Sequence, residues 1–295
     1  MSPIINLKNE VPIMSRIIDA HQHYWALDRG DYGWLTPEAG PVLYRDYGPA
    51  DLEPELARAG VSRTILVQAA RTHAETAYML ELAERTTSIA GVVGWLDFRD
   101  SNWRDVLSIF RAHPKFVGIR VMLQEMKDAS EALEPHSLQA LRFLAEIGLP
   151  VDLLLLEHQL PETIELLKRV PDLHAVIDHI AKPRIGEGVL EPWASRIRAI
   201  AEAHPGVYCK LSGMLTEADH EAWRREQFTA YVRHVVASFG TERVLFGSDW
   251  PVCLLAGSYA DARSVLASAL PEGLTDAQLA AVYGGNAAAF YKLKD

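Results

Sequence analysis

The stretch IIDAHQHYW, residues 17–25, joins an apolar run to two histidines that stand one residue apart. Successive side chains of a β-strand point to opposite faces, so we expect His21 and His23 on one face and Gln22 on the other. Two imidazoles at this spacing can bind one metal ion or hold one substrate, whereas the plainer alternative is a pair of unrelated surface histidines. The stretch predicts a strand whose carboxyl end carries functional groups.

Seven further runs are also short and apolar, and the segments between them have apolar residues at the spacing of a helix. Together with 16–21, the candidate strands are 64–69, 89–98, 116–123, 151–157, 174–180, 207–213 and 243–249. Continuous apolar runs are typical of strands that are covered on both faces in a parallel sheet. Longer helical patterns occupy 191–204 and 219–239, and 276–291 is expected to be the closing helix.

Eight strands that alternate with helices predict an α/β fold of the (β/α)8 TIM-barrel type, built as a single domain over residues 16–295. Residues 1–15 are expected to form an N-terminal extension. A doubly wound open sheet is the alternative, but the first strand–helix junction lacks the glycine-rich phosphate-binding motifs. The irregular segment 23–49 is too long for a plain turn, which favours a lid or a binding loop.

Composition limits the partners of the chain. Its 295 residues have a formal net charge of -10, which leaves no basic field to attract a nucleic acid. No apolar stretch reaches membrane-spanning length and no signal-peptide pattern is present, so no membrane partner is expected. The two cysteines, Cys209 and Cys253, cannot build a disulfide framework and favour a reducing cytoplasm. The oligomeric state is left open.

Polar side chains collect at the ends of the predicted strands, where the catalytic groups of a TIM barrel lie. Besides the two histidines of the first strand, they are Arg120, His158, His179, Lys210 and Asp249. An unpaired ammonium in a buried strand would be costly, which favours a pocket position for Lys210. Asp178 is expected to point away from His179 and to anchor the backbone. His158 fits a pocket position and a surface helix cap equally well.

Three of these strand ends carry motifs that resemble the amidohydrolase superfamily: DAHQHYW at 19–25, VIDHIAKP at 176–183 and LFGSDWPV at 245–252. They are similar to its amidohydrolase-2 branch of sugar lactonases, the L-fuconolactonase and L-rhamnonolactonase type. VVGWLDF and WPVCLLAGSY add to a match that runs from about residue 16 to the end of the chain. The resemblance implies a TIM-barrel hydrolase with His21, His23, His179 and Asp249 in its active site. Arg120 stands where binuclear members have a bridging ligand, which disfavours a two-metal site, and the branch includes members that work without metal.

Opening a lactone requires an activated water, a stabilised oxyanion and a proton for the leaving alkoxide. Asp249 is expected to be the general base, with His179 as a second catalytic residue. His21, His23 and Asp249 together could hold one divalent ion, zinc being the best match, with a fourth position open to water. Without metal, the histidines and Arg120 or Lys210 would polarise the carbonyl directly.

The substrate is predicted from aromatic and cationic side chains. Trp25 and Trp250 suit the C–H faces of a sugar ring, although tryptophan packs in protein cores equally often. The expected substrate-binding residues are Arg120, Lys210, His158, Trp25 and Trp250. Four cations could instead bind carboxylates, which favours an aromatic-degradation lactone of the pyrone dicarboxylate or muconolactone type: Arg71, Arg120, Lys182 and Arg184. A related metal-dependent decarboxylase and a non-catalytic binding barrel are the remaining alternatives.

Overall fold

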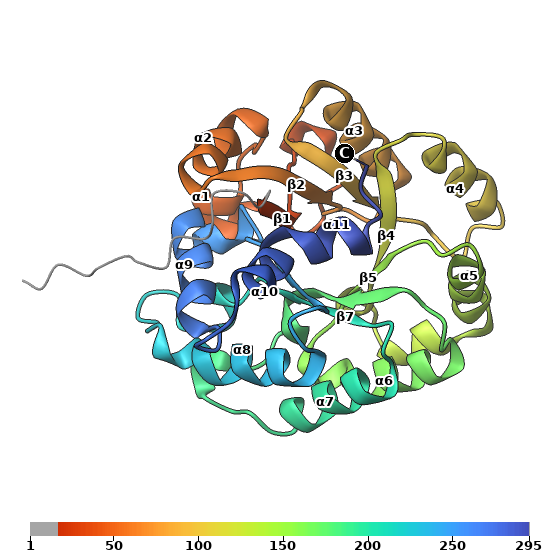
Figure 1. The fold of residues 1–295 in the computed structure, drawn as a ribbon. Helices are drawn as coiled ribbons and strands as arrows, with labels where there is room; N and C mark the ends of the chain where they lie inside the picture. The colour runs from red at the N-terminus through yellow and green to blue at the C-terminus, as the bar shows by residue number, and fades with distance from the viewer. Residues whose placement is uncertain (1–16, 295) are drawn as a thin grey trace, which may run out of the picture.

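The computed structural model describes residues 17–294 and has eight strands around a common centre, with helices outside them (Figure 1). The predicted extension at 1–15 lies outside the described residues. The strands are β1 Ile17–Gln22, β2 Val61–Val67, β3 Ile89–Gly94, β4 Phe116–Met122, β5 Val151–Leu154, β6 Ala175–Ile177, β7 Tyr208–Leu211 and β8 Val244–Phe246. All eight strands predicted from the apolar runs are confirmed.

The sheet follows chain order from β1 to β8, and every neighbouring pair is parallel. The barrel closes between the carboxyl end of β1 and the residues that follow β8. There the His21 carbonyl accepts a hydrogen bond from the Asp249 amide at 2.8 Å, and the Trp250 carbonyl accepts one from the His23 amide at 2.7 Å. The (β/α)8 barrel is confirmed, and its closure holds the candidate residues of the first and last strands together.

The helices lie between the strands and around the outside of the barrel. They are α1 Gly40–Leu43, α2 Pro49–Ala59, α3 His73–Arg85, α4 Trp103–Arg111, α5 Pro135–Glu146, α6 Leu160–Arg169, α7 Trp193–Ala203, α8 Glu226–Phe239, α9 Tyr259–Ala269, α10 Asp276–Ala280 and α11 Asn286–Phe290. A π-helical turn at Ala281–Gly285 joins α10 to α11. No helix among residues 17–294 is long and apolar enough to cross a membrane.

Several predicted elements are longer than the observed ones. The helix predicted over 219–239 begins at Glu226, because the Asp219 carboxylate accepts the amides of Glu221 and Ala222 at 3.0 and 3.1 Å and forms a local turn. The predicted strands at 151–157, 174–180 and 243–249 end three residues early. The residues cut off from these strands form irregular turns, and two of those turns carry candidate site residues.

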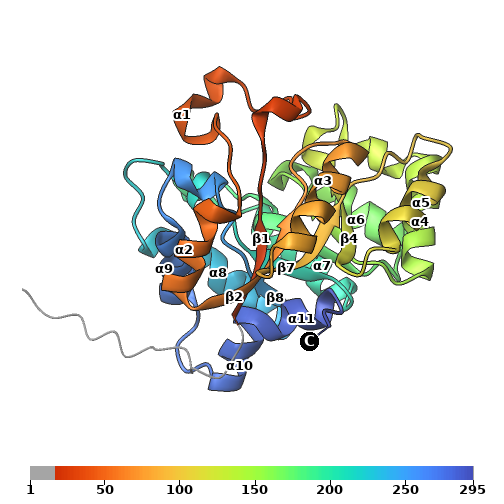
Figure 2. The ribbon, with the colours of Figure 1, turned by 90° about the horizontal axis from the view of Figure 1, so that it is seen from above.

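The long segment after β1 stands at the carboxyl ends of the strands. Figure 2 shows α1 projecting from one end of the molecule, opposite α10 and α11. The Trp34 indole donates to the Ala69 carbonyl at 2.8 Å, and Trp25 pairs with Tyr47 by backbone hydrogen bonds of 3.0 Å. The segment is therefore tied to the strand end of β2, which brings Trp34 to the rim of the barrel.

The barrel interior changes character along its axis. Phe290 and Tyr291 close the amino-terminal end of the barrel. The small and branched side chains that fill this end are Ile18, Ala20, Ile65, Val67, Val93, Val117, Val176 and Leu245. A larger apolar cluster packs between the strands and the helices. Both cysteines are free and buried, and the cytoplasmic location remains a prediction.

Candidate active site

His21 and His23 meet as the sequence spacing predicts. Their Nε2 atoms lie 3.2 Å apart, both rings are buried, and Gln22 points away to donate to Thr64 at 3.1 Å. His23 Nδ1 lies 2.8 Å from the Val67 carbonyl, which can only accept a hydrogen bond. His23 Nδ1 therefore carries the ring hydrogen, and the lone pair on Nε2 faces His21.

Asp249 approaches the same point from the turn after β8. Its Oδ1 lies 3.3 Å from His23 Nε2, 3.7 Å from His21 Nε2 and 3.8 Å from His179 Nε2. Burial opposes ionisation, but the neighbouring imidazoles of His179 and His23 outweigh it and lower the pKa of Asp249 below its usual value. The group is a buried carboxylate that is ionised at neutral pH.

His179 enters the cluster from a left-handed turn after β6. Residues 179–182 all have positive φ, and so does Asp249 at 59°. Left-handed backbone costs a non-glycine residue about 1–2 kcal/mol, and such residues concentrate at functional sites. Burial lowers the pKa of His179 well below its usual value, although Asp249 acts in the opposite direction. The left-handed turn therefore presents to Asp249 an imidazole whose pKa is held low by burial.

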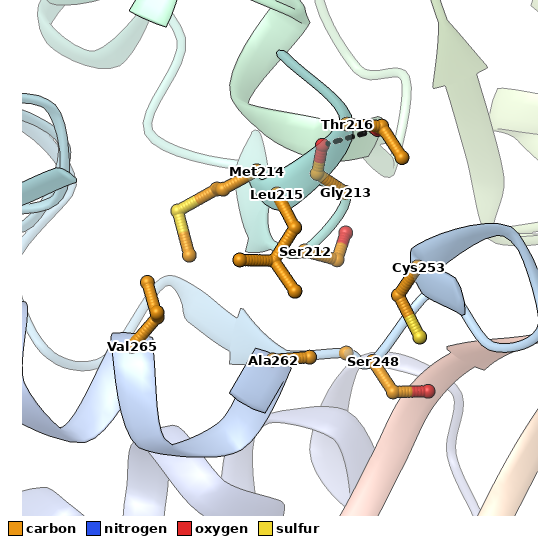
Figure 3. A pocket seen from close by; sticks show the side chains of 10 residues that line it. Ser212, Gly213, Met214, Leu215, Thr216, Ser248, Cys253, Ala262 and Val265 are labelled. Carbon is orange, nitrogen blue, oxygen red and sulfur yellow. Dashed lines mark hydrogen bonds between the residues drawn. The ribbon is translucent and has the colours of Figure 1, made fainter. Parts of the chain in front are cut away.

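The turn after β7 supports His179 from behind. His179 Nδ1 lies 2.9 Å from the Ser212 hydroxyl. Gly213 has φ +61, and a Cβ there would lie 2.5 Å from His179 Nδ1, so no larger residue fits. Figure 3 shows this turn, from Ser212 to Thr216, facing Ala262 and Val265 of α9 across a cavity of about 10 Å³. That volume is close to the minimum for one water.

A buried network of charges lies beneath the histidines. The Lys210 ammonium donates to Asp152 in a short contact, and it lies 3.0 Å from Asp178 Oδ1 and 3.1 Å from His21 Nδ1. Lys210, Asp152 and Asp178 have no exposed surface. Burial and the charge of Lys210 hold the pKa of His21 well below its usual value. The expectation that Asp178 points away from the site is wrong, because the strand ends at Ile177 and the turn reverses the side chain.

Arg120 connects this network to the open end of the barrel. Its Nε donates to Gln68 Oε1 at 2.9 Å, and its Nη1 lies 3.6 Å from Asp178 Oδ2 and 3.5 Å from His21 Nε2. Arg120 also lines a cavity of about 260 Å³. Arg120 can therefore reach a substrate, whereas Lys210 touches only protein.

The other expected substrate-binding residues are not gathered in the cluster. Trp25 is fully buried and its indole donates to the Arg45 carbonyl at 2.7 Å. Trp250 is 3% exposed and packs against Tyr47, with ring centroids 5.0 Å apart. His158 is exposed in a 3-10 turn at Glu157–Gln159. The two tryptophans therefore offer a substrate little or no surface, and a substrate-binding role for His158 stays a prediction.

Two cavities open at the rim of the barrel, and Arg120 lines the smaller of them. The cavity of about 260 Å³ and another of about 760 Å³ share Arg71, Trp95, Asp97, Arg99 and Glu125. Trp34 lines the larger cavity and is 37% exposed. The sequence does not reveal Trp95, because the apolar run 89–98 predicts a strand to its end. The strand stops at Gly94, and the residues that follow line both cavities.

The convergent side chains fit a single divalent ion. His21, His23 and Asp249 each offer one ligand atom, all within 4.8 Å of one another. In a tetrahedral site with bonds of about 2.0–2.1 Å, neighbouring ligand atoms lie about 3.3 Å apart. The separations of 3.2, 3.3 and 3.7 Å match this spacing. A second set combines His21, Asp178 and His179, but Asp178 already pairs with Lys210 and Arg120.

Known proteins match almost the whole length of this chain in sequence and in fold. A family model described as Amidohydrolase matches residues 18–293. An L-fucono-1,5-lactonase of Burkholderia ambifaria is 42% identical over 281 residues, which cover 94% of this chain and 95% of that protein. An L-fucono-1,5-lactonase of Burkholderia multivorans is 36% identical over 291 residues, covering 94% and 96%. The crystal structure of an amidohydrolase from Burkholderia multivorans with bound zinc has a TM-score of 0.89 and 35% identity, covering 94% of this chain and 99% of that one.

Proposed function

This chain belongs to the amidohydrolase family and is a hydrolase that acts on carboxylic esters, and we propose that it opens a sugar lactone to the free aldonic acid. The observation that carries the proposal is the convergence of three imidazole Nε2 atoms on one carboxylate oxygen, within 3.3 to 3.8 Å of it. The cluster lies at the carboxyl ends of the strands, where TIM barrels perform catalysis. The two relatives named as L-fucono-1,5-lactonases make a 1,5-lactone of a six-carbon sugar acid the first substrate to test.

In the proposed reaction, Asp249 is the general base. It is ionised at neutral pH, so it can take a proton from the water that attacks the lactone carbonyl carbon. Arg120 has a permanent charge and an open cavity beside it, so it stabilises the oxyanion that develops. When the carbon–oxygen bond of the ring breaks, the leaving alkoxide takes the proton that Asp249 received. His179, fixed by Ser212, lies 3.8 Å from Asp249 Oδ1 and lowers the pKa of that carboxyl group.

We propose that His21, His23 and Asp249 also hold one divalent ion, with zinc as the preferred metal. When bound, such an ion would polarise the carbonyl and lower the pKa of a water molecule. The Val67 carbonyl orients His23 for this role, as outer hydrogen bonds do for most histidine ligands. Arg120 and Lys210 beside His21 disfavour a second ion, because two fixed cations would repel it.

The positions of the four candidate cations weaken the case for a dicarboxylate substrate. Arg71 pairs with Glu125 at 3.0 Å, and Arg184 pairs with Glu157 at 2.7 Å and Glu187 at 2.9 Å. Lys182 lies 3.9 Å from Glu217, and Arg120 is held by Gln68 and Asp178. Each cation already faces an acid, so the rim offers little uncompensated positive charge. This arrangement favours a neutral polyhydroxylated lactone.

The test is acid release from a panel of lactones, measured with a pH indicator against spontaneous hydrolysis. L-Fucono-1,5-lactone and related aldonolactones should be hydrolysed, and 2-pyrone-4,6-dicarboxylate should not. Asp249→Asn should lower kcat by about 100- to 10,000-fold, because general-base assistance has that magnitude. Asp172→Asn is the control, since it removes an exposed carboxylate before β6, at the opposite end of that strand from His179. No turnover of any lactone, or near-normal turnover by Asp249→Asn, would contradict the proposal.

The metal is tested separately by elemental analysis of chelated and reloaded protein. We expect at most one ion per chain, lost in His23→Ala and retained in the exposed control His220→Ala. Two ions per chain would refute the single site. Full activity of metal-free protein would leave Asp249 as the base without metal assistance.

A further inference from the structure

A second cavity of unusual charge lies at the end of the barrel opposite the active site. It measures about 560 Å³ and is bordered by the first residues of β3 and β4 and by the end of the chain. Figure 2 places α11 and the chain end on the side away from α1. Among the described residues, its lining contains no aspartate or glutamate and six basic side chains: Arg63, Arg111, His113, Lys115, Lys292 and Lys294.

Three of these cations are held in place by neutral acceptors. Lys115 Nζ donates to the carbonyls of Ala83 at 2.6 Å and Thr86 at 3.2 Å. Lys292 Nζ donates to the Gly148 carbonyl at 2.7 Å, and Arg63 Nη1 donates to the Lys294 carbonyl at 2.9 Å. An ammonium has three N–H donors and a guanidinium has five, so each group keeps donors for a ligand. Within residues 17–294, these three cations are thus positioned without being neutralised, whereas His113 of the lining lies 3.6 Å from Glu84.

The cavity is lined by positive charge, although the whole protein has a negative net charge. The chain has a formal net charge of -10, yet the two arginines and three lysines of the lining form no ion pair within residues 17–294. Burial and the charge of Arg63 lower the pKa of Lys115, so like charges crowd one another here. A bound anion would relieve this repulsion.

The capping of helix ends explains the positions of only some of the basic side chains around this cavity. Cations near a helix carboxyl end can satisfy its last carbonyls. Lys115 donates to Ala83 in the last turn of α3, and Lys292 donates to Gly148 two residues after α5. Arg63 instead lies on β2, and Lys294 follows α11 at the end of the chain. A role in capping helices therefore does not account for the gathering of cations around one cavity.

We propose that this cavity binds a small multivalent oxyanion of the phosphate-ester class. Arginine matches phosphate with two parallel hydrogen bonds, and lysine adds compact positive charge. The volume is at the size of small-molecule sites and exceeds that of a lone phosphate group, which points to a phosphorylated metabolite. The site lies at the opposite end of the barrel from Asp249 and does not depend on the proposed lactone hydrolysis.

The test is isothermal titration of the full-length protein with pyrophosphate as the probe, at constant ionic strength set with sodium chloride. We expect saturable binding with a dissociation constant below about 1 mM. Arg63→Gln and Lys294→Gln should each weaken it at least about tenfold, the effect of losing one charge-assisted hydrogen bond. Arg142→Gln is the matched control, because it removes an exposed cation on α5 and should leave the affinity unchanged.

Lys294→Gln keeps the proposal falsifiable even where Arg63→Gln unfolds the protein, because Lys294 is exposed beyond the last helix. Citrate, a polycarboxylate of similar charge, should bind at least about tenfold more weakly than pyrophosphate. Equal affinity for citrate would overturn the assignment to phosphate esters. The absence of saturable binding up to about 10 mM, or equal losses in Arg142→Gln and Lys294→Gln, would overturn the site itself.

Discussion

Gly213→Ala tests whether the turn after β7 positions His179 for catalysis. The new Cβ would lie 2.5 Å from His179 Nδ1 and 2.6 Å from its Cγ, whereas ordinary contact begins at 3.4 Å. The imidazole must therefore shift by about 0.9 Å, the difference between 3.4 and 2.5 Å. A misplacement of about 1 Å can cost about 100-fold in rate, so we expect kcat to fall by that factor. The variant should also lose about 1–2 kcal/mol of stability, because alanine adopts the left-handed region unfavourably.

Gly188→Ala separates the two effects. Gly188 has φ +69, but nothing lies within 4 Å of the position that a Cβ would take. This control should lose a similar free energy of unfolding in urea and keep kcat within about twofold. Kinetics with the best lactone of the panel and urea unfolding of both variants provide the comparison. Normal kcat in Gly213→Ala, or an equal loss of kcat in Gly188→Ala, would refute the positioning argument.

Three further perturbations test other parts of the structure. Tyr259→Phe removes the hydroxyl that donates to buried Asp19 at 3.0 Å, and it should lower the free energy of unfolding by about 1–3 kcal/mol, measured in urea, with kcat nearly unchanged. Burial raises the pKa of Glu75 from 4.5 to about 8, so between pH 4.5 and pH 8 the folded state keeps a proton that the unfolded chain has released. Stability should therefore fall with rising pH across this window, by up to about 1.4 kcal/mol per pH unit, and Glu75→Gln should remove that slope in urea titrations at several pH values. Trp34→Ala should raise KM for the lactone about 3- to 10-fold at similar kcat, since it removes aromatic surface from the rim cavity; a loss confined to kcat would contradict a binding role.

The barrel could be predicted from the sequence because each strand is buried on both faces. That burial leaves an apolar run with few polar interruptions, and eight such runs separated by helical spacing leave few alternative folds. The prediction that His21 and His23 lie on one face of β1 followed from the two-residue period of a strand. Strand ends were less predictable, because VIDHI at 176–180 continues the apolar pattern while its backbone leaves the sheet after Ile177. The left-handed turn that follows has no glycine to mark it.

The partners of buried polar residues could not be predicted from the sequence. A lysine within the apolar run VYCKLSG predicts an acidic partner, but the pattern does not identify the residue that provides it. The structure supplies Asp152 from β5 and Asp178 from the turn after β6. VDLL, the part of VDLLLLE that forms β5, contains the same signal as VYCKLSG, a single charge in an apolar strand, and pairing these two charges would have located the ion pair. The tryptophans of the motifs carry no such signal, because burial and substrate contact favour the same residue type.

The pairing of charges at the barrel centre identifies which carboxylate is available for chemistry. Asp152 pairs with Lys210, and Asp178 pairs with both Lys210 and Arg120, so two acids and two bases balance one another. Asp249 is the third buried acid there, and only imidazoles lie within ion-pair distance of it among residues 17–294. Burial and neighbouring cations lower the pKa of His21, so imidazoles rather than permanent cations stand beside the Asp249 charge. A buried anion in that condition is suited to bind a metal ion or to accept a proton from water, and a purely structural carboxylate would have been paired with Lys210 or Arg120 as its two neighbours are.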